Sequence, residues 1–88
     1  MYLHLGQSVV VADQDVIGIF DLDNSSYSRL TRDFLERAEK EGRVVSVTDD
    51  LPKSFALCRD RHGNTTVYLS QLSSATLKGR MESRNFEF

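Results

Sequence analysis

Few residues in this 88-residue chain have the types and the spacing that chemistry requires. Asp21 and Asp23 are separated by one residue, between an apolar run and a charged segment, as in the Asp-x-Asp nucleophile motif of phosphotransferases. That chemistry also needs Mg²⁺, further carboxylates and a phosphate-binding lysine on a large parallel sheet. A chain of this length with hairpin signals cannot supply them. We therefore interpret the stretch as the end of a strand, with the polar residues 24–26 as caps of the following helix.

The two histidines and the single cysteine do not match the pattern of a metal site or of an activated nucleophile. His4 and His62 are far apart in the sequence, and neither has a Cys or His at metal-ligand spacing. We expect His4 on the polar face of an edge strand and His62 in an exposed turn. Cys58 lies in a strand-like run, where a small core residue is a commoner role than a nucleophile. The sequence therefore predicts no enzyme, no cofactor and no metal ion.

Basic side chains are the remaining candidates for chemistry, and they gather toward the end of the chain. Residues 51–88 carry six Lys and Arg against three acids, whereas residues 1–28 carry four Asp and no Lys or Arg. Lys and Arg neutralise phosphates, which supplies most of the non-specific affinity of proteins for DNA. The candidate DNA-binding residues are Lys53, Arg59, Arg61, Lys78 and Arg80. They would bind weakly in a monomer but form a continuous track around an oligomer; the alternative is solvated charge that keeps the protein soluble.

Local patterns predict six short strands and one main helix. Alternation and β-branched residues favour strands over residues 2–5, 9–12, 16–22, 43–48, 54–59 and 65–70. Apolar residues at helical spacing predict a helix that ends at Gly42, with Tyr27, Leu30, Phe34, Leu35 and Ala38 on its core stripe. We expect a short second helix over residues 73–80, stopped by Gly79, and an aperiodic tail over residues 81–88. Gly18 inside the third strand indicates a bulge or a close backbone approach.

The tight connections predict how these elements assemble. Residues 13–15 read as a hairpin turn, so the first three strands are expected to form an antiparallel meander with the main helix laid across it. The predicted fold class is α+β: a small antiparallel sheet of about six short strands, one main amphipathic helix and a short C-terminal helix. We expect one domain over residues 1–80, followed by the tail.

Composition sets the expected surroundings of this domain. A chain this short has a thin core, which favours self-association. Its acidic start and basic end can meet head to tail in copies of the chain, or mix in space and cancel. Apolar runs are too short for a membrane span and no signal segment is evident, so we expect a cytoplasmic protein without membrane contact.

Four blocks of the sequence carry a family resemblance. They are the opening Met-Tyr-Leu-His-Leu-Gly and residues 15–21, 52–54 and 68–78. Together they resemble the RemB (YaaB-like) branch of the extracellular matrix regulator (RemA/RemB) family, in register over nearly the whole chain. The resemblance implies a bacterial protein whose domain is similar to LytTR-type DNA-binding modules. It also implies a ring-like homo-oligomer that regulates biofilm matrix genes.

The RemA branch implies where such a protein contacts DNA. Its arginines lie in the turn before the third strand and in the loop after the strand that follows the helix. Here residues 13–15 are Asp-Gln-Asp, and the loop holds Leu51 and Pro52, followed by Lys53. Two functions therefore stand beside each other. One is a DNA-binding transcriptional regulator of matrix genes, and the other is an oligomeric scaffold or adaptor that binds a regulatory protein partner without DNA contact.

Overall fold

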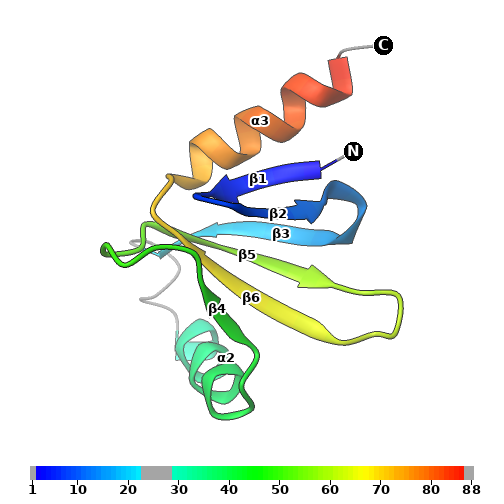
Figure 1. The fold of residues 1–88 in the computed structure, drawn as a ribbon. Helices are drawn as coiled ribbons and strands as arrows, with labels where there is room; N and C mark the ends of the chain where they lie inside the picture. Colours follow the sequence, from blue (N-terminus) through cyan, green and yellow to red (C-terminus); the bar gives the residue numbers. More distant parts are fainter. Residues whose placement is uncertain (1, 23–28, 87–88) are drawn as a thin grey trace.

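Six short strands form two sheets in the computed structural model, which describes residues 2–22 and 29–86 (Figure 1). The elements in chain order are β1 (Tyr2–Gly6), β2 (Val9–Ala12), the 3₁₀ turn η1 (Asp13–Asp15), β3 (Val16–Asp21), α2 (Arg29–Lys40), β4 (Val44–Ser46), β5 (Ser54–Arg59), β6 (Thr65–Ser70) and α3 (Ser74–Phe86). The predicted α+β class and the predicted strands are confirmed, with bounds that differ by a few residues at most.

The predicted meander is wrong. β1 and β2 pair with each other in a sheet of their own, whereas β3 pairs with β5 in a four-stranded sheet of order β3-β5-β6-β4. The reason is the connection: η1 is a 3₁₀ turn flanked by extended Ala12 and Val16, and it passes the chain from one sheet to the other. The expected hairpin of β2 with β3 therefore does not form.

The larger sheet is also not purely antiparallel, as we had predicted. β4 pairs with β6 in parallel, while β5 is antiparallel to both β3 and β6. Two reversals of chain direction separate β4 from β6, one on each side of β5, so that β6 runs the same way as β4. The bulge predicted at Gly18 is confirmed, because the β3–β5 register shifts between Val16 and Gly18.

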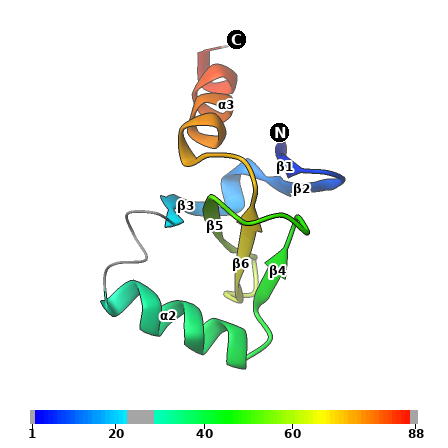
Figure 2. The same ribbon diagram turned by 90° about the vertical axis from the view of Figure 1, so that its left-hand side faces the viewer.

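The four-stranded sheet is covered on both faces, by different elements. The β1–β2 hairpin and α3 lie over one face and α2 lies over the other (Figures 1 and 2). The first interface has a core of buried residues, which are Leu3, Leu5, Val11, Ile19, Val47, Ala56, Cys58 and Leu77. The second has a smaller core of Ala38, Phe55 and Val67. Successive residues of β5 thus point into different cores, as the two-residue period of a strand requires.

Two buried serines provide polar contacts inside this sandwich. The Ser70 hydroxyl donates to the Leu5 carbonyl oxygen (2.6 Å) and accepts from the Leu72 N–H (3.1 Å). The Ser54 hydroxyl donates to the Leu72 carbonyl oxygen (2.7 Å). Both serines are fully buried, so each bond satisfies groups that water does not reach. The Ser70 bond in addition joins β1 to β6, across the two sheets.

Helix α2 ends as predicted but packs through its later turns. Gly42 adopts a left-handed φ of 71°, and its N–H donates to the Glu39 carbonyl oxygen at 3.1 Å. Ala38 is buried and Phe34 is half-buried, whereas Leu30 is 81% exposed. The prediction that Leu30 belongs to the core is therefore wrong. The helix contacts β4 and β6, and its first turn, which carries Leu30, is not covered by them. Tyr27 and the predicted caps at 24–26 lie outside the described residues.

Helix α3 is longer than predicted. The Ser73 hydroxyl accepts the Thr76 N–H at 3.1 Å, as an N-cap does, and the helix continues through Gly79 to Phe86. A glycine inside a helix costs about 1 kcal/mol relative to alanine. Leu77 and Met81, on either side of Gly79, pack on the core, and this packing outweighs the cost of the glycine. Residues 81–86 are therefore helix, although we had expected them in an aperiodic tail.

Leu77→Ala should lower the free energy of unfolding by about 2–5 kcal/mol, because it leaves a cavity where α3 meets β1 and β3. The neighbouring exposed Lys78→Ala is the matched control and should change it by less than about 0.5 kcal/mol. Chemical denaturation of both variants measures the difference. Equal stability of the two would mean that α3 does not pack on this core.

Ser70→Ala should lower the free energy of unfolding by about 1–3 kcal/mol, because the Leu5 carbonyl oxygen loses its buried donor. Ser46→Ala removes an exposed serine hydroxyl that bonds the Thr48 carbonyl oxygen at 2.7 Å, and should cost less. Thermal melts and amide exchange of β1 compare the two variants. Faster exchange in β1 for the Ser70 variant alone is the expected signature.

Candidate nucleic-acid interface

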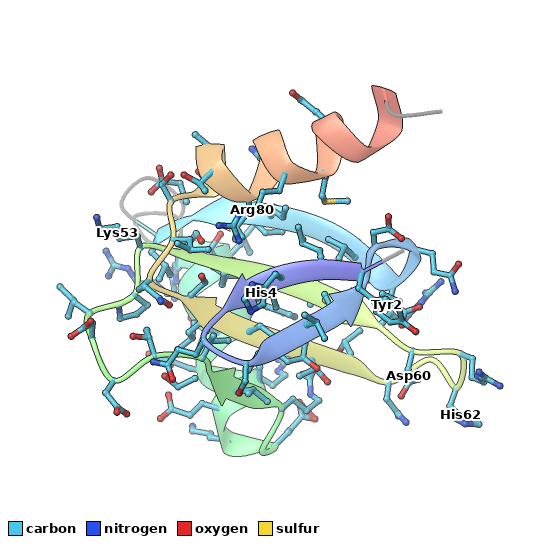
Figure 3. All side chains as sticks on the ribbon, turned by 45° about the horizontal axis from the view of Figure 1, so that its top comes forward. Tyr2, His4, Lys53, Asp60, His62 and Arg80 are labelled. Atoms are coloured by element: carbon cyan, nitrogen blue, oxygen red, sulfur yellow. The ribbon has the colours of Figure 1, made fainter. Side chains whose placement is uncertain are left out.

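The predicted basic residues do not form one patch on a single chain. Figure 3 shows Lys53 at one end of the larger sheet, Asp60 and His62 at the opposite end, and Arg80 on α3. Lys53 immediately precedes β5 and Arg59 ends it, so their Cα atoms are roughly 20 Å apart at about 3.3 Å per strand residue. Any flat ligand that contacts all of them must therefore span the domain or bridge several copies of it.

Lys53 has a fixed backbone and an exposed side chain. Its N–H donates to the Ser70 carbonyl oxygen (2.9 Å), and its own carbonyl oxygen accepts the Leu22 N–H (3.1 Å). The preceding Pro52 further restricts the loop. Little backbone entropy remains to be lost when the ammonium group binds an anion, although the exposed Asp49 and Asp50 lie in the same loop.

Arg59 and Arg61 flank an ordered acidic turn. The Asp60 carboxylate accepts the backbone N–H groups of Asn64 (3.0 Å) and His62 (2.8 Å). These bonds, the Asn64 one above all, hold the pKa of Asp60 below its ordinary value. The carboxylate is therefore ionised at neutral pH between the two arginines, and it offsets part of their charge. His62 is exposed in this turn, as predicted.

Lys78 and Arg80 lie on α3, with different surroundings. Lys78 is exposed. The Arg80 guanidinium donates from Nη1 to the His4 carbonyl oxygen at 3.0 Å, which links α3 to β1 (Figure 3). Arg80 thus helps to hold the β1–β2 hairpin against α3. Only its remaining N–H groups can bind an anion. His4 is exposed, as predicted for an edge strand, and its Nε2 lies 2.6 Å from the Gln7 carbonyl oxygen.

Arg43 has a structural role that the sequence did not reveal. Its guanidinium bonds the Thr65 hydroxyl through Nη1 and pairs with the Glu41 carboxylate through Nη2 at 2.8 Å. It also lies 5.9 Å from the centre of the Phe34 ring. Arg43 therefore joins the end of α2 to β6, and this basic residue is engaged in holding the fold.

The cysteine is a core residue, as predicted. Cys58 is buried on β5, facing the hairpin. Burial, and to a lesser degree the charge of Asp15, raise the pKa of its thiol to about 11. The thiol is thus protonated at neutral pH, which is the unreactive form. Cys58 also borders an open cavity of about 350 Å³ between the hairpin and the ends of β5 and β6.

An apolar groove lies on the α2 face of the sheet, and sequence reasoning missed it. Its volume is about 210 Å³, and it is lined by Phe20, Leu30, Thr31, Phe34, Phe55 and Leu57. Leu30 lines this groove and is 81% exposed. The helical spacing of Leu30 marked it as part of an apolar stripe. It did not show whether the sheet extends far enough beneath the helix to bury this residue.

Residues 2–22 and 29–86 contain no group of three or more His, Cys, Asp or Glu side chains arranged to hold a metal ion. Within the same residues, neither α2 nor α3 has the length and apolar character that a membrane crossing requires.

Comparison with known proteins agrees with the resemblance found in the sequence. Residues 2–81 match the family described as extracellular matrix regulatory protein A-like, RemA-like. The chain is 35% identical over 82 residues to extracellular matrix regulatory protein B of Bacillus subtilis (strain 168), an alignment that covers 93% of this chain and 91% of the relative. The resemblance is thus confirmed over nearly the whole described domain. The chain belongs to the RemA-like family of extracellular matrix regulatory proteins.

Proposed function

We propose that this protein is a DNA-binding transcriptional regulator of extracellular matrix genes that acts as a ring-like homo-oligomer. The observation that carries the proposal is family membership over residues 2–81, together with a relative named as a matrix regulatory protein. The proposal includes the similarity to LytTR-type modules that the family resemblance implies. It places the protein in the cytoplasm, where chromosomal DNA is accessible.

The distribution of charge explains why DNA binding would require an oligomer. One copy offers a single lysine at one end of the sheet and two arginines around Asp60 at the other, with a net charge of −2 overall. A contact with one or two phosphates is weak at physiological salt. Repetition of Lys53 around a closed assembly multiplies the number of phosphates neutralised along one duplex, and the affinity rises with that number.

An oligomeric scaffold or adaptor for a regulatory protein is the second candidate. Two observations favour it: η1 presents Asp13 and Asp15 where the RemA branch implies an arginine, and Asp60 stands between Arg59 and Arg61. Carboxylates repel phosphates and would oppose DNA at these positions. An assembly of this kind would bind a partner protein and have no affinity for duplex DNA.

If DNA is the ligand, the protein should bind random-sequence duplex at low salt, with log K falling linearly as log salt rises. The slope is about −0.9 for each phosphate neutralised, because bound cations are released. A fluorescence anisotropy titration at several salt concentrations measures it. Absence of binding even at the lowest salt would reject DNA in favour of the adaptor.

Lys53→Glu should weaken binding to all duplex sequences about equally and flatten the salt slope by about 0.9 for each subunit that contacts DNA. Lys40→Glu reverses an exposed lysine of α2, outside the predicted site, and is the matched control. Both variants should keep the parental mass in light scattering. Parental affinity in the Lys53 variant would move the contact to Arg59, Arg61 or the α3 residues.

A further inference from the structure

The apolar groove has rigid walls and an open side. Phe20 stacks on Phe55, with ring centres 5.0 Å apart, and its ring lies over Gly18, where an added Cβ would be 2.8 Å away. Because Gly18 has no side chain, there is room for the Phe20 ring to lie flat on the sheet. Leu30 overhangs the other side of the groove from α2 and remains 81% exposed. These side chains form a preformed apolar receptor on the β3 edge of the sheet.

An exposed apolar side chain projects from the loop between β4 and β5. Leu51 is 88% exposed, in the connection from the edge strand β4 to β5. The loop is held before it by the Asp50 N–H, which donates to the Thr48 hydroxyl at 3.0 Å, and after it by the bond of Lys53 to Ser70. A large aliphatic side chain is thus presented to solvent on ordered backbone, so little loop entropy opposes its burial.

The residues that directly precede the two features are opposite in charge. Asp49 and Asp50, both exposed, precede Leu51 in the loop. Arg29, also exposed, precedes Leu30 at the groove, and the first turn of α2 contains no acidic residue. The exposed Asp33 in the next turn and Lys53 after Leu51 offset part of each charge. The Leu51 loop and the Leu30 groove therefore match both in apolar side chains and in the charge of the residues that precede them. Such a combination fixes the register of a contact as well as its strength.

We propose that Leu51 of one copy of the chain occupies the Phe20–Leu30 groove of the next copy, with Asp49 and Asp50 beside Arg29. Leu51 lies in the β4–β5 loop and the groove lies between β3, β5 and α2, so the projection and the receptor are two different surfaces of one molecule. In this head-to-tail contact one copy supplies Leu51 and the next supplies the groove, and its repetition closes a ring or extends a filament. Lys53, two residues after Leu51, then lies near every seam between copies. The inference rests on the self-association in the proposed function and names its surfaces.

The test uses the full chain with one half of the contact damaged at a time. Leu51→Glu removes the projection and Leu30→Glu spoils the receptor, and both change exposed residues, so circular dichroism melts should remain parental. Light scattering should give the parent as an oligomer and each variant alone as a monomer of 10.0 kDa. An equimolar mixture should regain a species of twice the mass of one chain, because each variant retains the half that the other lacks.

A control and a cross-link complete the design. Val10→Glu, at a 54% exposed residue of β2 outside both surfaces, should keep the parental mass. Mixing Leu51→Cys with Leu30→Cys under oxidising conditions should give a disulfide-linked dimer, while the buried Cys58 does not react.

Three results would overturn the inference, and they differ in what else they affect. An oligomeric parent whose Leu51→Glu and Leu30→Glu variants keep its mass places the interface elsewhere and leaves the proposed function standing. Two monomeric variants that do not combine, or cysteine variants that do not cross-link, reject the head-to-tail pairing. A monomeric parent rejects both the pairing and the self-association, while the salt titration with duplex still decides DNA binding separately.

Discussion

Strand β5 is buried on both of its faces, and the rest of the fold is arranged to meet that constraint. Phe55 faces α2, whereas Ala56 and Cys58 face the hairpin, and all three are nearly inaccessible to water. A strand with apolar residues on both faces is stable only as a central strand between two covering layers. β5 accordingly lies between β3 and β6, and the chain on either side of it supplies two different covers.

The two covers are unequal, and the difference shapes the surface. The hairpin and α3 close their face with the larger core, and the buried Ser70 bond and the Arg80 bond fix them in place. Helix α2 covers only the β4–β6 side of its face, because its contacts to the sheet come from its later turns. The open groove is therefore a direct consequence of one short helix covering a four-stranded sheet. Exposed apolar surface of this kind commonly marks a contact with another molecule.

The same geometry keeps the basic residues of one chain apart. The basic residues sit at the ends of β5 and on α3, separated by the length of a strand and in part engaged in internal bonds. The proposed head-to-tail arrangement of copies would repeat each of them at regular intervals. Under either proposed function, the DNA or the partner protein would contact such an assembly through residues of several copies.

Local sequence determined most of the secondary structure. Strand positions follow from alternation and β-branched residues, the end of α2 from Gly42, and the bulge from Gly18; each is decided by residues within a few positions. Residue identities also sufficed to recognise the family and to list the basic candidates, because both depend on side-chain type and order alone.

Only the tertiary structure decided which strands pair, where α3 ends and how the candidate residues lie relative to one another. A three-residue connection such as η1 suits a hairpin or a passage between sheets, and the pairing of β3 with the distant β5 decides between them. Gly79 is a helix breaker by local propensity, yet packing of Leu77 and Met81 outweighs it. Leu30 has helical spacing, but its exposure depends on how much sheet lies beneath it. In each case the deciding energy comes from contacts between residues far apart in the chain, which local sequence does not specify.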